Sequence, residues 1–427
     1  MSFQTGLSGL NASSKSLDVI GNNIANANTV GMKSSRAEFA DIVASSLGAG
    51  GGGNGAGIGV AVSTISQQFT QGNINITGNN LDVAVNGGGF FQVTKTNGSI
   101  AYSRDGQFKL DKDGNLLTNT GAFVMGYPTD ATGAATSNST QKLTLPTSKP
   151  IDAKATTTVT AEFNLDARAK DATQAVAAGE AVTPRSKYGT SVSVYDTQGV
   201  ASSANLYFEK TNGVPNSWDV YAGLDNPAAL PPVVFANLGP IVFDTAGSVT
   251  GPVLGTGVGL TIPGGTIPDS NPNELTGFIP TPIDIKLDNV TQFGVNFSVT
   301  NLAQDGYTAG EFTSLNIDGK GVISTSYSNG QTLKTGGMIA LANFRNLQGL
   351  APVGSGEYLE TFKSGSVVLG QPGAGQFGEL RAGAVEESNV DITSELVNMM
   401  TAQRNYQANA QTIKTQDQIM STLVNLR

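Results

Sequence analysis

Apolar residues recur with helical spacing at the N-terminal end of the chain. Steps of three, four and seven residues place them on one face of a helix, and polar side chains cover the remaining positions. The apolar positions are Phe3, Leu7, Leu10, Leu17, Ile20 and Ile24. The pattern predicts an amphipathic helix within the first 30 residues.

A longer and more regular pattern fills the C-terminal end. Apolar or aromatic residues occupy eight of ten positions that alternate steps of four and three residues. The positions are Ile392, Leu396, Met399, Gln403, Tyr406, Ala410, Ile413, Asp417, Met420 and Val424. No proline or glycine interrupts residues 384–427, and Ser388 or Asp391 is placed to cap the helix. A heptad pattern sustained over this length predicts a coiled coil.

Two interpretations of the terminal helices are open at this point. Each helix could lie on its own domain, or the two could pair with each other and with other copies of the chain. Neither has a neighbouring helix in the sequence to pack on, which favours pairing. Gln403 and Asp417 also suit a coiled-coil seam, because polar seam residues lower stability but fix register and the number of partners.

Between the two ends, the pattern changes to the period of two residues that is typical of strands. It holds at about 72–146 and again at 287–345, and Asp-Gly or Asn-Gly pairs predict turns there. These pairs are Asp105–Gly106, Asp113–Gly114, Asp305–Gly306, Asp318–Gly319 and Asn329–Gly330. A Thr-, Ala-, Pro- and Gly-rich stretch at 147–286 separates the two segments. Strand-like runs inside it are 191–196, 204–210 and 217–223.

These patterns predict an α+β multidomain chain with nested domains. The terminal α-helices form a coiled-coil core domain, and two mainly-β outer domains are nested by insertion. The expected parts are a helical polymerisation core at 1–30 plus 388–427, linker regions at 31–71 plus 363–387, a β-rich middle domain at 72–146 plus 287–362, and an inserted β-rich outer domain at 147–286. The glycine-rich run at 48–59 lacks the Gly-Lys-Ser/Thr of a phosphate-binding loop, so it predicts a flexible connection.

Composition narrows the class of function. Only 13% of the 427 residues are charged, 54 are glycine, and the net charge is −9. Nucleic acid or anionic lipid would need a basic face on the protein, so we expect neither as a partner. The N-terminus has no apolar leader, and no run of 18 apolar residues occurs. We therefore expect no cleaved signal peptide and no membrane insertion.

The chain has no cysteine and no histidine, which excludes disulfides, thiolate zinc sites and Ser-His-Asp or Cys-His catalysis. Residues 111–115 resemble part of a calcium loop, but Thr120 stands where that loop needs a Glu, so a hairpin turn is favoured. Asp244–Gly247 resembles an aspartic-protease loop without its second copy and is interpreted as a surface turn. The lone Trp218 is expected in the core of the inserted domain. We expect no catalytic residue, no metal and no cofactor.

Several segments resemble those of bacterial flagellar hook proteins. The first 39 residues do so, above all GNNIANANTVGMK at 21–33, a run shared in variant forms by flagellar rod and hook proteins. Residues 78–93, 102–127 and 387–427 match the same pattern of flagellar axial proteins. The resemblance covers about two-thirds of the chain, whereas the stretch at 147–286 carries no specific match.

The resemblance implies a structural subunit and not an enzyme. Hook proteins polymerise into a curved flexible tube, a universal joint that transmits torque from rod to filament during motility. Their terminal helices form its inner coiled coil. The resemblance also implies contacts with rod, hook-cap and hook–filament junction proteins, and passage through the flagellar type III export apparatus to an extracellular hook. The distal rod subunit is the nearest alternative, although the inserted stretch argues for the hook, and a secreted β-rich adhesin is a third reading.

Overall fold

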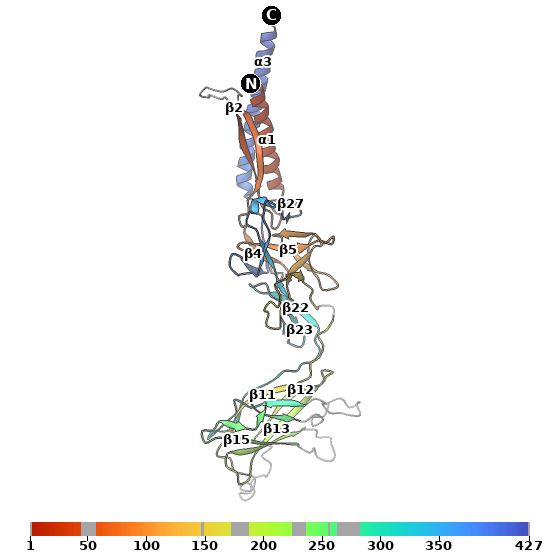
Figure 1. Cartoon of the computed structure of the whole chain (residues 1–427), viewed down its shortest axis with the longest axis vertical. Helices are drawn as coiled ribbons and strands as arrows, with labels where there is room; N and C mark the ends of the chain where they lie inside the picture. Colours follow the sequence, from red (N-terminus) through yellow and green to blue (C-terminus); the bar gives the residue numbers. More distant parts are fainter. Residues whose placement is uncertain are drawn as a thin grey trace. The chain divides into compact units, whose positions relative to one another are not determined.

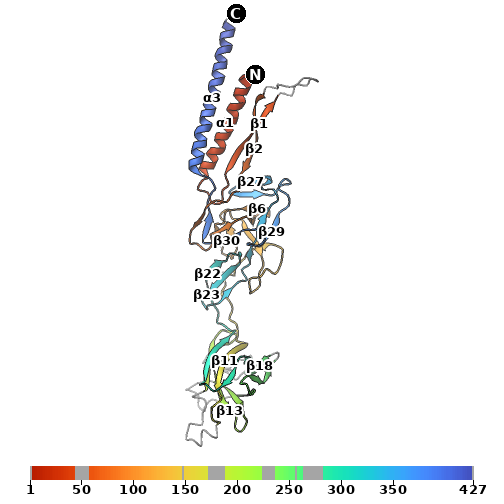
Figure 2. The same cartoon turned by 90° about the vertical axis from the view of Figure 1, so that its left-hand side faces the viewer.

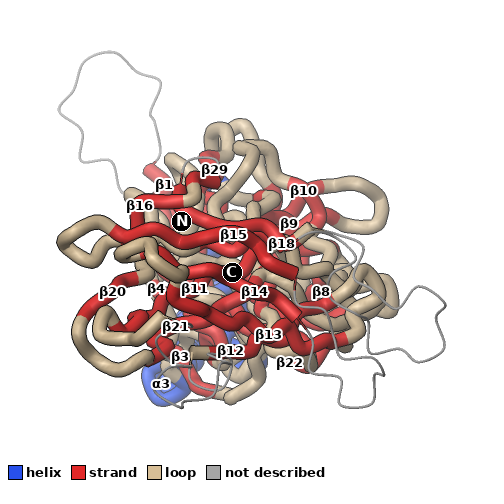
Figure 3. Tube along the Cα trace, turned by 90° about the horizontal axis from the view of Figure 1, so that it is seen from below, coloured by secondary structure: helices blue, strands red, loops and turns tan. Residues whose placement is uncertain are grey.

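The fold was obtained as a computed structural model, which describes residues 2–43, 57–146, 149–171, 188–223, 236–254, 257–262 and 282–425. Outside the helices, the described chain consists mostly of strands and loops (Figure 3). It divides into two compact units. Unit 1 comprises Met1–Ser148, Thr313–Ser326 and Thr332–Arg427, and unit 2 comprises Lys149–Phe312 and Tyr327–Gln331.

The two terminal helices belong to unit 1 and lie side by side (Figures 1 and 2). α1 spans Ser2–Ala25 and α3 spans Ile392–Asn425, so the prediction of a helix at each end is confirmed. Of the two candidate caps, Asp391 occupies the capping position. Its Oδ1 accepts a hydrogen bond from the backbone N–H of Thr393 at 2.9 Å, which satisfies a donor that has no partner inside the helix.

An antiparallel hairpin accompanies α1. Its strands are β1 (Ser35–Val43) and β2 (Gly57–Gln67), and both contact the helix. The region at 31–71, which we expected to be a linker, therefore contains paired strands. The contact of these strands with α1 depends on tertiary packing, which the alternation of residues does not reveal. Most of the glycine-rich run at 48–59 lies outside the described residues.

The main sheet of unit 1 has the strand order β27-β28-β6-β5-β9-β8-β7, with further strands attached to β9 and β5. The strands are β5 (Phe90–Thr94), β6 (Ile100–Ser103), β7 (Phe108–Leu110), β8 (Leu116–Thr118), β9 (Phe123–Tyr127), β10 (Gln141–Lys142), β25 (Met338–Ile339), β26 (Leu341–Asn343), β27 (Ala351–Gly354), β28 (Glu357–Leu359) and β29 (Val368–Gly370). A short 3-10 helix, η2 (Leu347–Gly349), precedes β27. Edge-to-face aromatic pairs such as Tyr102–Phe344, with ring centroids 4.7 Å apart, fill the core beneath the sheet.

Short sheets join segments from the two halves of unit 1. β3 (Ile74–Ile76) pairs with β31 (Ala384–Glu386), and β4 (Val83–Asn86) pairs with β30 (Glu379–Ala382). A third sheet contains β22 (Phe312–Ile317), β23 (Ile323–Tyr327) and β24 (Thr332–Leu333). Residues 379–386 were expected to be linker, but they form strands because their partners lie about 300 residues earlier, beyond the reach of any local pattern.

Unit 2 consists of two sheets that share one hydrophobic core. The first sheet contains β11 (Thr158–Asp166), β17 (Val253–Leu254), β18 (Gly257–Ile262), β19 (Ile283–Lys286), β20 (Thr291–Phe293) and β21 (Ser298–Gln304). The second contains β12 (Gly189–Tyr195), β13 (Ala201–Lys210), β14 (Ser217–Gly223), β15 (Ala236–Phe243) and β16 (Val249–Gly251). The three predicted strand runs correspond to β12, β13 and β14 and are confirmed. Trp218 is fully buried in the shared core, as expected.

The boundary of the inserted unit differs from the expected one. We placed residues 287–362 in the middle domain, but 287–312 belong to unit 2. β20 and β21 both pair with β11, and Leu287 and Val290 are buried in the core of unit 2. Alternation of side chains identifies a strand but does not say which sheet it joins, so the sequence could not locate this boundary.

Three of the five predicted turn pairs connect consecutive strands of one sheet. Asp113–Gly114 lies between β7 and β8, Asp318–Gly319 between β22 and β23, and Asn329–Gly330 between β23 and β24. The other two predictions were wrong as hairpin turns. Asp105–Gly106 connects β6 to β7, which are not neighbours in the sheet, and Asp305–Gly306 follows β21 and leads to an isolated bridge between Lys154 and Tyr307.

Candidate functional site

Small residues line the contact between α1 and α3. A Cβ atom added at Gly6 would lie 3.1 Å from Cγ1 of Ile413, and one added at Gly9 would lie 2.8 Å from the amide nitrogen of Asn409. Ala402 is buried on the same side of α3. The two helices therefore approach so closely that larger side chains at these positions would force a shift.

The N-terminal positions predicted for the interface differ in burial. Ile20 is buried, Leu10, Leu17 and Ile24 are partly buried, Leu7 is exposed, and Phe3 lies on the first turn of α1. Val19 is buried next to Ile20, although the prediction did not include it. The structure therefore gathers the second half of the predicted stripe into contact with the rest of unit 1 and leaves Leu7 open.

The predicted stripe of α3 is mostly open to solvent in a single copy. Met399, Ala410 and Ile413 are partly buried; Ile392, Leu396, Gln403, Tyr406, Asp417 and Met420 are exposed; and Val424 lies near the helix end. The residues that meet α1 include Glu395, Asn409 and Ile413. Ile413 belongs to both sets. The heptad pattern thus identified α3, but most of the α1 contact lies to one side of the predicted stripe, because small and polar residues form it together with Ile413.

Asn23 ties α1 to both of its neighbours. Its Oδ1 accepts a hydrogen bond from the backbone N–H of Ser35 at 2.9 Å, and its Nδ2 donates to the backbone oxygen of Ser35 at 2.8 Å. The same Nδ2 donates to Oε1 of Glu395 at 3.2 Å. One buried side chain therefore connects α1 with the start of β1 and the first turn of α3. It lies in the GNNIANANTVGMK run.

Asn389 makes a second polar junction just before α3. Its Oδ1 accepts from the backbone N–H of Ser34 at 2.7 Å, and its Nδ2 donates to the backbone oxygen of Gln68 at 2.7 Å and to Oγ1 of Thr70 at 2.8 Å. Asn389 thus holds the two ends of the β1–β2 hairpin against the chain that enters α3. Both junctions join segments that are far apart in the sequence.

Lys33, Arg104 and Glu386 form a buried ionic cluster close in sequence to these junctions. Glu386 Oε1 lies 2.6 Å from Nζ of Lys33, and Glu386 Oε2 lies 2.9 Å from Nη1 of Arg104. All three side chains are at least nine-tenths buried. The backbone N–H of Gly72 also donates to Oε1 of Glu386 at 2.9 Å, and Lys33 Nζ donates to the backbone oxygen of Thr70 at 2.7 Å. The carboxylate is therefore paired and hydrogen-bonded, as a buried charge requires.

Electrostatics in this cluster follow from burial. Desolvation lowers the pKa of Lys33 below its ordinary value, although the hydrogen bond to Glu386 acts in the opposite direction. Burial raises the pKa of the nearby Tyr358 to about 12. The sequence analysis missed this cluster. Single charged residues such as Lys33 and Glu386 give no local signal of burial, and 353 positions separate the two.

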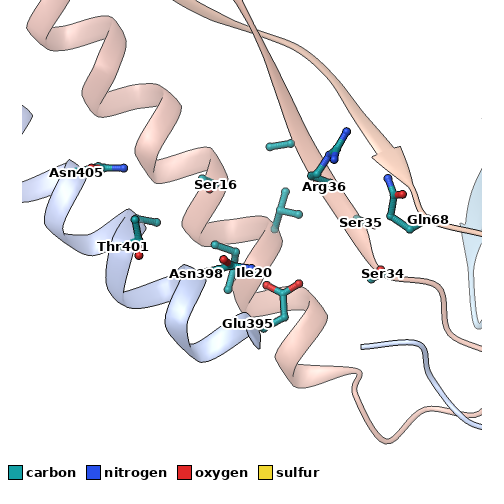
Figure 4. Close-up of a pocket in the computed structure, with 13 residues that line it drawn as sticks. Ser16, Ile20, Ser34, Ser35, Arg36, Gln68, Glu395, Asn398, Thr401 and Asn405 are labelled. Atoms are coloured by element: carbon teal, nitrogen blue, oxygen red, sulfur yellow. The ribbon is translucent and has the colours of Figure 1, made fainter. Parts of the chain in front are cut away.

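Two grooves run along the helix pair. The first, which we call the polar groove, has a volume of about 400 Å³ and lies between α1, α3 and β1 (Figure 4). Its lining residues are Ser16, Val19, Ile20, Ser34, Ser35, Arg36, Ala37, Gln68, Glu395, Asn398, Thr401, Ala402 and Asn405. The second, the small-residue groove, has a volume of about 380 Å³. Its lining residues are Gly9, Ala12, Ser13, Ser16, Phe39, Val60, Ala402, Asn405, Ala408 and Asn409.

The two loops that resembled catalytic or metal sites are turns. Asp111 Oδ1 accepts from the backbone N–H groups of Asp113 and Asn115, and Asp244 does the same for Ala246 and Ser248. Each carboxylate is thus used by its own turn, which is the ordinary role of Asp in such loops. Within the described residues, no group of three or more acidic side chains is arranged to hold a metal ion.

Family profiles match four segments of the chain, one of them at each end. They are the flagella basal body rod protein at residues 3–33, the flagellar hook protein FlgE/F/G D1 domain at 84–164, the flagellar basal body protein FlaE D2 domain at 164–307 and the flagellar basal body rod FlgEFG protein C-terminal at 381–426. The D2 match ends at 307, close to the end of the main segment of unit 2. The fold and these matches define a flagellar axial protein.

Full-length relatives narrow the class. The flagellar hook protein FlgE of Salmonella typhimurium is 41% identical, and that of Escherichia coli (strain K12) is 40% identical, each over 100% of both chains. That of Treponema pallidum is 34% identical over 100% of this chain and 99% of its own. The chain belongs to the flagellar hook protein FlgE family.

A solved structure supports the fold. The crystal structure of Helicobacter pylori flagellar hook protein FlgE2 superposes with a TM-score of 0.52 and 15% identity, covering 72% of this chain and 99% of that chain. Among the residues that the structure describes, neither helix combines the length and apolar character needed to cross a membrane.

Proposed function

We propose that the terminal helices of this chain, a structural subunit of the flagellar hook, form the coiled-coil interface through which it polymerises. The observation that carries the proposal is a set of large apolar side chains on α3 that remain exposed in one copy. Its residues are Ile392, Leu396, Val397, Met400, Ile419 and Met420, each between 44% and 55% exposed. Four of them lie within the first three turns of the helix and two lie near its end, and neighbouring copies of α1 and α3 would cover both groups.

The polar positions of the predicted seam fit the same proposal. Gln403 and Asp417 are exposed in one copy and lie along α3 between the two apolar groups. Between copies, such residues select one register of the helices at some cost in stability. The full interface proposed therefore comprises the helical positions predicted from the sequence, together with Val397, Met400 and Ile419.

The remaining parts of the chain would build the outside of the polymer. With the helical core inside, the β-rich parts of unit 1 and the inserted unit 2 form outer layers that slide past their neighbours as the tube bends and transmits torque from rod to filament. Rod, hook-cap and junction proteins would contact the two ends of the tube. Export through the flagellar type III apparatus is consistent with a chain that has no cysteine to form early disulfides. The role is structural, and no catalytic step is required.

Relatives decide between the hook and the rod. The N-terminal and C-terminal profile matches bear rod names, so the terminal segments alone do not separate the two. The full-length relatives are hook proteins, and their similarity extends through the inserted unit. The distal rod subunit is therefore not favoured, and neither is a secreted adhesin.

Substitution of two of the exposed apolar residues of α3 tests the proposed interface. Replacing Leu396 and Met400 by Ser should raise the concentration needed for tube formation by more than tenfold, because both side chains would be buried only in the polymer. Electron microscopy of the purified chain under polymerising conditions measures the outcome. Lys414→Gln, an exposed position outside the predicted stripe, is the control and should polymerise normally.

Removing residues 388–427 should abolish tubes, because the truncated chain lacks the whole of α3. Tubes of normal length and stability after that truncation would refute the proposal.

A further inference from the structure

Phe362 exposes its entire side chain on unit 1. Its relative exposure is 103%, and it lies in the turn between β28 and β29. Leaving an aromatic ring in water forgoes the free energy of burial, so a ring held in this position is suited to an interface. The helix stripe described above does not include it, and the sequence pattern gave no indication of it.

The turn that carries Phe362 is fixed by hydrogen bonds on both sides of the ring. The Oγ of Ser364 donates to the backbone oxygen of Thr361 at 2.8 Å and accepts from the backbone N–H of Thr361 at 3.0 Å. Ser364 is fully buried. Asn346 Nδ2 donates to the backbone oxygen of Lys363 at 3.0 Å. A ring presented on such a turn loses little further backbone freedom when it binds.

The small-residue groove offers a complementary cavity on the same chain. Its walls include Gly9, Ala12, Ala402 and Ala408, whose short side chains leave about 380 Å³ open between α1, α3 and the β1–β2 hairpin. Phe39 adds an aromatic wall. No charged side chain lines the groove among the described residues, so it suits an apolar occupant.

A projecting ring and a separate cavity on one chain are suited to a head-to-tail contact between two copies. Because Phe362 is fully exposed, it does not occupy the groove of its own copy. Two different, complementary patches join copies head to tail, and such a contact repeats into an open helical polymer when its rotation does not close. A second copy of this chain is therefore the occupant that the geometry favours.

We propose that Phe362 of one copy inserts into the small-residue groove of a second copy. The inference rests on the proposed function, because it adds a contact to the same polymer. It assigns to the β28–β29 turn a role in joining the β-rich part of one subunit to the helix pair of the next.

Site-directed cross-linking tests which surfaces meet. The chain has no native cysteine, so a short bismaleimide reacts with introduced thiols only. Polymers of the variant with Lys363→Cys, an exposed position next to the Phe362 ring, and Ser13→Cys should give covalent multimers on denaturing gels. The matched control combines Lys363→Cys with Asn11→Cys, which is exposed on α1 outside the groove lining and should give at least tenfold less product. Equal yields from both pairs, or no multimers from either, would overturn the proposal.

Substitution of the ring provides an independent test. Phe362→Ser should raise the critical concentration for polymerisation by roughly 10- to 100-fold, as expected for the loss of one buried aromatic side chain, and Phe362→Leu should restore most of it. The thermal unfolding of the monomer should not change, since the ring makes no packing contact there. Normal polymerisation of the folded Phe362→Ser variant would overturn this inference alone. Failure of the unmodified chain to polymerise would instead refute the proposed function.

Discussion

At Glu386, two cations from distant parts of the sequence meet one carboxylate. Lys33 follows the N-terminal helix and Arg104 follows β6, while Glu386 ends the strand that leads to α3. The cluster therefore joins the chain leaving α1, the β-rich part of unit 1 and the chain approaching α3. Each side chain depends on the others, because an unpaired charge in this position would be desolvated without compensation.

Replacing Glu386 by Gln should lower the free energy of unfolding of unit 1 by about 3–5 kcal/mol, because Lys33 and Arg104 would remain buried without a counter-charge. Urea unfolding followed by circular dichroism measures the change. The control is Lys15→Gln, which breaks the exposed ion pair with Asp18 and should cost less than about 1 kcal/mol. Equal, small effects of the two substitutions would show that the buried cluster does not stabilise unit 1.

Among the elements, the pair of α1 and α3 depends on glycine and alanine residues, which a pattern of large apolar side chains does not identify. The heptad spacing and Asp391 correctly predicted where α3 lies and how it begins. The face of α3 that meets α1 was not predicted. Gly6, Gly9 and Ala402 let the two helices approach closely but bury little apolar area, so they give no hydrophobic signal. The large apolar side chains of α3 remain available for contacts between copies.

Enlarging Ala402 should separate the two helices. Ala402→Leu adds three carbon atoms to a buried position of the helix contact and should cost about 1–3 kcal/mol through overpacking. Loss of helical circular dichroism at a lower temperature and a reduced yield of tubes by electron microscopy are the expected results. Gln411→Leu, at an exposed position of the same helix, adds apolar volume without crowding and should leave the melting temperature nearly unchanged. Similar melting of both variants would contradict the close contact.

At the scale of the whole molecule, unit 2 is an insertion with closely spaced ends. The backbone N–H of Ile151 donates to the oxygen of Gly310 at 2.8 Å, and the N–H of Gly310 donates back at 3.2 Å. The entering and leaving segments are thus adjacent, antiparallel and hydrogen-bonded. All the strands in the two sheets of unit 2 lie between these two residues, so removal of the insertion leaves the sheets of unit 1 complete.

Deleting residues 152–309 and joining Ile151 to Gly310 through two glycines should give a chain that still forms tubes. We expect the tubes to differ in curvature or bending stiffness, because the proposed interface lies on the terminal helices and the same proposal gives unit 2 only outer contacts. Electron microscopy of the polymers measures diameter and curvature, and circular dichroism checks that the shortened chain folds. A folded variant that forms no tubes would show that unit 2 is required for assembly, contrary to this expectation.

Local sequence patterns were enough to predict the two terminal helices, the strands β12 to β14, the turns at Asp111 and Asp244, the buried Trp218 and the resemblance to hook proteins. These features depend on local spacing, capping and turn chemistry, which neighbouring residues supply. Four features came only from the folded chain: the face of α3 that meets α1, the pairing of residues 287–312 with unit 2, the strands in the expected linkers, and the meeting of Lys33, Arg104 and Glu386. Each of these depends on partners that lie far apart in the sequence, up to about 400 positions for Gly6 and Ile413, and packing and desolvation across the folded chain select among such partners.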